Sequence, residues 1–252
     1  MTDDKSTIHP RGRKSDCGLT TLRDPSQRSQ PRGRGSVCRR FLSVICHLSF
    51  VILLGACASR PTFRTVVVDP GHGGHDPGAT QRGVLPEKIW TLDLAYRLKS
   101  RLEQAGFTVV MTRTNDVFIP LENRVLISNS EPKVIFVSLH FNSTPNRAIQ
   151  GVETYYDTGR SAKLAAKVQQ SVLQLPGVFD RRVKTAPYYV IRYNTKPAIL
   201  VEGGFLSNPI ESRRVTSPGY RDALADQIYE GIVAYRGRTP AQENATAKTA
   251  AR

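Results

Sequence analysis

The stretch TVVVDPGHGG, residues 65–74, runs four strand-forming residues directly toward a histidine surrounded by glycine. A strand that only has to turn needs one glycine, whereas three glycines around an imidazole let the backbone approach a ligand or clear space for the ring. The stretch therefore indicates either a phosphate cradle or a site at which His72 is aimed. A dinucleotide-binding fingerprint needs glycine or alanine where this chain has Asp76, which argues against the phosphate cradle.

Strand and helix patterns alternate from this stretch onward. Continuous apolar strands between helices indicate an α/β fold, with a mixed, mostly parallel sheet and helices on both faces, formed as a single domain. We expect strands at 65–68, 107–112, 134–139, 188–191 and 198–201, an exposed strand at 151–156, and helices at 86–105, 120–130, 161–175 and 222–235.

The composition divides the chain into four segments. Residues 1–40 are rich in Arg, Ser, Pro and Gly without apolar periodicity, which predicts a disordered basic extension; a start codon assigned too far upstream would also explain it. Residues 41–57 form an apolar run after two arginines and read as a signal segment. The folded domain is predicted at 61–236, and a disordered polar tail at 237–252.

The signal segment ends in LGAC, residues 54–57, which resembles the lipobox of bacterial lipoproteins, where the cysteine is lipidated. This resemblance implies a membrane anchor through Cys57. Ala58, where the family sorting rule would want Asp for inner-membrane retention, favours the outer membrane. A cleaved signal without lipid and an uncleaved anchor are the alternatives.

The charge of the chain is strongly basic. The net charge is +15, and residues 1–60 supply +7 of it, from eleven Lys/Arg against four Asp/Glu. A basic surface suits an anionic polymer, but the chain has no nucleic-acid-binding motif, so we expect no nucleic-acid partner. All four cysteines precede residue 58, so the folded domain has neither a disulfide nor a thiolate zinc site.

Three of the predicted buried strands lead into residues that could bind a metal or carry a proton. These residues are His72, His140 and Glu202. Each alone would more often be a turn or core residue. Ligands collect at the carboxyl ends of strands in α/β sheets, however, so the three together predict a site at one edge of the sheet.

A fourth candidate, Glu87, opens the first predicted helix. An acid there interacts favourably with the helix dipole, which is the ordinary explanation. Glu87 also shares a stripe with Leu94 and Leu98, which should face the sheet, and a carboxylate at the head of a buried face needs a counter-charge. A cation would supply it.

Two histidines and a carboxylate are a typical ligand set for catalytic zinc, with the fourth position left to water. We therefore assign His72, Glu87 and His140 to Zn²⁺ and Glu202 to proton transfer. His75 is a competing ligand, but its place three residues further along a Gly/Pro loop predicts that it faces solvent.

Several segments resemble the zinc-dependent N-acetylmuramoyl-L-alanine amidases of bacterial cell-wall remodelling. They include DPGHGG (69–74), PEKIW (86–90), SLHFN (138–142) and VEGGF (201–205), and the resemblance extends over about 64–235. It implies hydrolysis of the amide between N-acetylmuramic acid and L-alanine in peptidoglycan, with the same three zinc ligands and the same catalytic glutamate. We expect a monomer in the cell envelope, on the periplasmic side.

Two other functions fit parts of the pattern. A zinc carboxypeptidase or aminopeptidase on a related scaffold would share the chemistry but cut a peptide bond. A non-catalytic peptidoglycan-binding relative would keep the fold, but such relatives lack one of the four site residues, and this chain has them all. We expect three arginines to pair with acids rather than to contact substrate: Arg113, Arg124 and Arg192.

Overall fold

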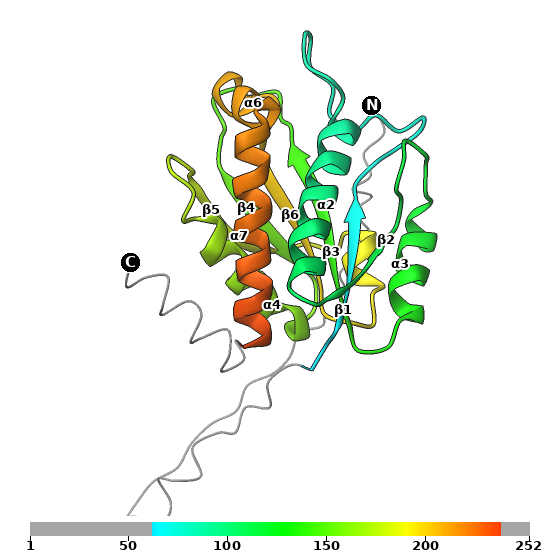
Figure 1. Ribbon diagram of the computed structural model, residues 1–252. Helices are drawn as coiled ribbons and strands as arrows, with labels where there is room; N and C mark the ends of the chain where they lie inside the picture. Colours follow the sequence, from blue (N-terminus) through cyan, green and yellow to red (C-terminus); the bar gives the residue numbers. More distant parts are fainter. Residues whose placement is uncertain (1–61, 238–252) are drawn as a thin grey trace, which may run out of the picture. The chain divides into compact units, whose positions relative to one another are not determined.

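A six-stranded sheet organises the part of the chain that the computed structural model describes, residues 62–237 (Figure 1). All neighbouring strands are parallel except β4 and β6, which are antiparallel. The predicted mixed, mostly parallel sheet is therefore confirmed. The strands lie in the order β2 (Thr108–Met111), β1 (Thr65–Pro70), β3 (Val134–Asn142), β6 (Ala198–Phe205), β4 (Val152–Tyr156) and β5 (Asp180–Thr185).

Helices cover both faces of the sheet, as predicted. One face packs against α2 (Glu87–Gln104), α4 (Gly159–Val172) and α7 (Pro218–Arg236), and Figure 1 shows α2 and α7 side by side over it. The other face packs against α3 (Leu121–Ser130) and the short α5 (Tyr189–Arg192). A further helix, α6 (Pro209–Thr216), follows β6 and leads into α7.

Burial on both faces explains why the central strands are apolar throughout. Val66 and Val68 of β1 face the larger core, whereas Val67 faces the smaller one. In α2 the stripe that includes Leu94 and Leu98 is buried against the larger core, as its four-residue spacing predicts. These apolar layers fix the strand ends, and therefore the residues that follow them.

Two strand predictions were wrong in detail. Residues 188–191 are not a strand, because 189–192 form the helix α5. A four-residue apolar run fits either structure, and here Val190 and Ile191 pack into the smaller core. The strand at 151–156 is not exposed: β4 lies between β6 and β5, and Glu153 and Thr154 are buried.

The elements β5 and α6 were not predicted, and α7 begins at Pro218 rather than at 222. The β5 sequence DRRVKT is charged because it forms the edge of the sheet, where charge is common and apolar alternation is weak. Among residues 62–237, no helix is both long and apolar enough to cross a membrane. The predictions for 1–40, 41–57 and the tail beyond 237 lie outside the described residues.

Candidate metal centre

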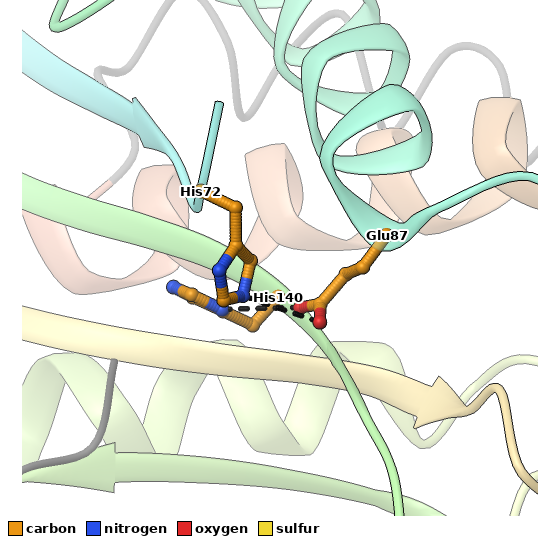
Figure 2. A group of neighbouring side chains, drawn as sticks. All are labelled: His72, Glu87 and His140. Atoms are coloured by element: carbon orange, nitrogen blue, oxygen red, sulfur yellow. Dashed lines mark hydrogen bonds and ion pairs between the residues drawn. The ribbon is translucent and has the colours of Figure 1, made fainter. Parts of the chain in front are cut away.

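The three predicted metal ligands meet at the carboxyl edge of the sheet. His72 follows β1, His140 lies near the end of β3, and Glu87 is the first residue of α2. Figure 2 shows the three side chains pointing toward one another. His72 Nε2 lies 3.2 Å from Glu87 Oε2, and His140 Nδ1 lies 3.1 Å from Glu87 Oε1. One donor atom from each residue fits within 4.8 Å of the others, so the group could hold a metal ion.

The charges of this group are strongly coupled. Burial alone would lower the pKa of His72, but the charge of Glu87 and the hydrogen bond with Asp76 outweigh it and raise the pKa to about 10. Burial would likewise raise the pKa of Glu87, yet the two imidazoles hold it well below its ordinary value. Glu87 is therefore ionised. An ionised carboxylate facing two imidazoles is a donor set suited to a divalent transition metal.

Further hydrogen bonds orient these ligands. Both oxygens of Glu87 accept backbone bonds, Oε1 from the Phe141 amide at 2.8 Å and Oε2 from the Ala79 amide at 2.9 Å. Asp76 Oδ2 lies 2.8 Å from His72 Nδ1. A carboxylate on one ring nitrogen fixes the tautomer and aims the other nitrogen at a metal. Asp76 therefore holds His72 with Nε2 toward Glu87.

Glycines make the room that the ligands occupy. A Cβ on Gly71 would lie 2.2 Å from His140 Cε1, and a Cβ on Gly78 would lie 2.6 Å from His72 Cδ2 and 2.7 Å from Glu87 Oε2. His72 itself has φ 63°, a left-handed conformation that non-glycine residues adopt mainly where the surroundings enforce it. The glycines next to His72 and in its loop thus clear space for several ligands rather than for His72 alone.

The predicted proton-transfer residue, Glu202, lies one strand away from a ligand. It stands opposite His140 in the parallel pairing of β3 with β6, so both side chains leave the same face of the sheet. Neighbouring strands are about 4.8 Å apart. Glu202 is 0% exposed. A buried carboxylate therefore lies beside His140, outside the group of three donors that could hold a metal ion.

Two buried arginines hold the loop that carries His72. Arg124 pairs with Asp69 at 2.8 Å and donates to the carbonyl of His72 at 2.8 Å, while Arg113 donates to the carbonyl of Gly71 at 2.8 Å. Burial and the charge of Arg124 lower the pKa of Arg113 to about 10, so Arg113 stays charged at neutral pH. Arg124 pairs with an acid, as expected, whereas Arg113 donates to carbonyl groups; Arg192 is exposed.

Comparison with known proteins identifies the family. The family model described as N-acetylmuramoyl-L-alanine amidase matches residues 66–234. The chain belongs to the N-acetylmuramoyl-L-alanine amidase family. The resemblance seen in the sequence is thereby confirmed, and the described residues form an amidase catalytic domain.

Relatives of this amidase-family chain share its domain. It is 37% identical over 175 residues to the N-acetylmuramoyl-L-alanine amidase LytC of Bacillus subtilis, covering 68% of this chain but only 35% of LytC. The germination-specific N-acetylmuramoyl-L-alanine amidase of the same organism is 32% identical over 189 residues, covering 68% of this chain and 79% of the relative. The structure of the amidase AmiC2 of Nostoc punctiforme has 38% identity and a TM-score of 0.66, covering 68% of this chain and 96% of AmiC2.

His75, the competing ligand, is exposed, as predicted, and its ring centroid lies 4.1 Å from that of Phe118.

The amidase domain also contains residues near the site that the sequence did not reveal. Asp76, Asp69 and the contacts of Arg124 with the loop were not predicted. The sequence did contain an indication of the role of Asp69, because a carboxylate at the end of an apolar strand needs a buried partner. Its partner comes from α3, 55 positions further along the chain.

Proposed function

We propose that this chain hydrolyses the amide bond between N-acetylmuramic acid and L-alanine in peptidoglycan, with a zinc ion held by His72, Glu87 and His140. The observation that carries the proposal is the convergence of these three donors within 4.8 Å in a member of the amidase family. Two nitrogen donors and one oxygen donor suit zinc and leave a fourth position for water.

The chain's own groups account for the rest of the reaction. His72, Glu87 and His140 would hold zinc, which would acidify a bound water and polarise the scissile carbonyl. Glu202 accepts the proton of the attacking water and returns it to the leaving amine of L-alanine. Its place beside His140 brings the carboxylate within one strand spacing of the ligands. Asp76 keeps His72 in the orientation that binding requires.

The substrate also defines where the protein acts. Peptidoglycan lies in the cell envelope, so we place the activity on the periplasmic side. LGAC and the basic-apolar run before it support an outer-membrane anchor through lipidated Cys57. Cys57 lies outside the described residues.

The test uses the full chain on intact peptidoglycan, with products read by mass spectrometry. Chelator should abolish release of the stem peptides, and added zinc should restore it. His140→Ala should lose both zinc and activity, whereas Glu202→Gln should keep zinc but lose about 10²–10⁴-fold in rate, because it removes a proton acceptor and not a ligand.

Other outcomes would reject the proposal. Release of amino acids with the stem still attached to the glycan would indicate a zinc peptidase. Binding to peptidoglycan without any product from the zinc-loaded protein would indicate a non-catalytic relative. If Glu202→Gln were purified without metal, the roles of Glu202 and Glu87 would be exchanged.

A further inference from the structure

A second buried carboxylate, Glu153, lies next to Glu202 on the side away from the metal ligands. Glu153 of β4 stands opposite Glu202 of β6 in their antiparallel pairing, and it is 2% exposed. Residues in register share a face of the sheet. His140, Glu202 and Glu153 therefore form a row on three adjacent strands, β3, β6 and β4.

Two cations bind this carboxylate. Glu153 Oε2 accepts from Arg181 Nε at 3.1 Å and from Lys184 Nζ, and both cations come from β5. Glu153 Oε1 accepts from Asn142 Nδ2 at 2.7 Å and from the Tyr155 hydroxyl at 2.8 Å. Burial alone would raise the pKa of Glu153, but its bonds with Lys184 and Tyr155 outweigh it and lower the pKa. Glu153 is therefore ionised and binds both cations directly.

The two cations keep donors that the protein does not use. The side chains of Arg181 and Lys184 are 32% and 36% exposed. Within residues 62–237, Arg181 donates only through Nε and Lys184 only to Glu153. The guanidinium has five donors and the ammonium three. A guanidinium fork with unused terminal nitrogens suits a carboxylate, which it can bind through two parallel hydrogen bonds.

A strand irregularity turns Lys184 toward this face. The pairing of β4 with β5 shifts register after Val152, where β5 contains one extra residue, and Arg182 there has φ 73°. Lys184 consequently lies opposite Tyr155, on the face that Glu153 shares. In a regular strand Lys184 would point to the other face. Bulges often redirect a side chain beside an active site.

The direction of the substrate follows from the proposed function, on which this inference rests. The scissile carbonyl must lie at the metal ligands and the leaving nitrogen at Glu202. The stem peptide then continues past Glu202, away from β3 and over β4 and β5. Strands are spaced about 4.8 Å apart, and each extended peptide residue spans about 3.3–3.6 Å. The second residue of the stem therefore comes within reach of side chains that extend from β5 over Glu153.

We propose that Arg181 and Lys184 form a subsite for a carboxylate of the stem peptide, at its second residue. Glu153 is the positioning residue that holds both cations beside Glu202. In a muramyl dipeptide the second residue carries a free α-carboxylate, whose charge and shape match the guanidinium fork of Arg181. The subsite binds the part of the substrate that leaves, so it contributes to binding rather than to the chemical step.

The test compares two muramyl dipeptides whose second residue carries either a free α-carboxylate or its amide. A hydrogen bond with charged groups contributes about 1.5–3 kcal/mol, so KM should be about 10–100-fold lower for the free acid, with similar kcat. Arg181→Gln and Lys184→Gln should each reduce this preference, mainly through KM. Arg182→Gln is the matched control, because it removes the same charge from an exposed neighbour on the same strand.

A second measurement keeps this inference separate from the proposed function. Calorimetry of the corresponding dipeptide products with the zinc-loaded protein reports binding without turnover, and the free acid should again bind more tightly. If neither the muramyl dipeptides nor intact peptidoglycan is cleaved, the proposed function fails, while the product affinities still test the subsite. If both are cleaved and bound equally well, the subsite is wrong and the function stands. An equal loss of preference in Arg182→Gln would reveal general charge attraction and overturn the subsite.

Discussion

Replacing Asp76 by alanine tests whether the orientation of His72 limits metal binding. Asp76 Oδ2 lies 2.8 Å from His72 Nδ1, and its other oxygen accepts from the Gly78 amide at 3.0 Å. The bond with the imidazole is nearly buried, so its loss removes one charge-assisted hydrogen bond, worth about 1.5–3 kcal/mol. At about 1.4 kcal/mol per factor of ten, zinc affinity should fall about 10–100-fold. The zinc affinity of Asp76→Asn should lie between those of the wild type and Asp76→Ala.

The assay is competition for zinc with a chromophoric chelator, with thermal unfolding of the metal-free protein as a check on folding. Asp116→Ala is the control. Asp116 accepts from the Gly74 amide and from Lys88 Nζ, both at 2.7 Å, so it holds the same loop without contacting a predicted ligand. It should keep wild-type zinc affinity. Unchanged zinc affinity in Asp76→Ala, or an equal loss in Asp116→Ala, would show that the bond between Asp76 and His72 does not limit metal binding.

Three further perturbations probe other parts of the chain. Gly71→Ala should lose zinc, because its Cβ would lie 2.2 Å from His140 Cε1. A Cβ on Gly159 would meet nothing within 4 Å, so Gly159→Ala should retain zinc; metal content of the purified variants checks this. Burial raises the pKa of Asp69, but its paired arginine outweighs this and holds the pKa below the ordinary 3.8. Its stabilising contribution is therefore complete above that value and is lost as pH falls through the folded-state pKa. Thermal melts should show the stability deficit of Asp69→Asn shrinking as pH falls below 3.8. Cys57→Ser should move the protein from the membrane fraction to the soluble one, and unchanged fractionation would remove the lipid anchor.

The sequence was sufficient for the central parallel strands of the sheet and for the candidate ligands because both depend on local patterns. Buried parallel strands are apolar throughout, so their ends are visible in the sequence. The residues that follow those ends must lie near one another once the strands pair in parallel. The helical stripe of Glu87 and Leu94 identified the third ligand in the same way. The sequence could therefore indicate the three candidate ligands, His72, His140 and Glu87, without knowledge of any tertiary contact.

The errors around β4 and β5 have one cause, which also explains why the carboxylate subsite was missed. GVETYY alternates in the way an exposed strand does, and DRRVKT, which contains several charged residues, was not predicted to be a strand. Each segment resembles a surface segment only when it is considered without its neighbouring strand. In the folded chain Glu153 is buried because Arg181 and Lys184 neutralise it from the neighbouring strand, and both cations lie on the edge because they have Glu153 to bind. The charge of a residue can be read from the sequence alone. Whether that charge is buried depends on the neighbouring groups that compensate it in the folded chain. Polar segments between apolar strands in α/β sheets therefore merit a search for compensating partners before they are assigned to the surface.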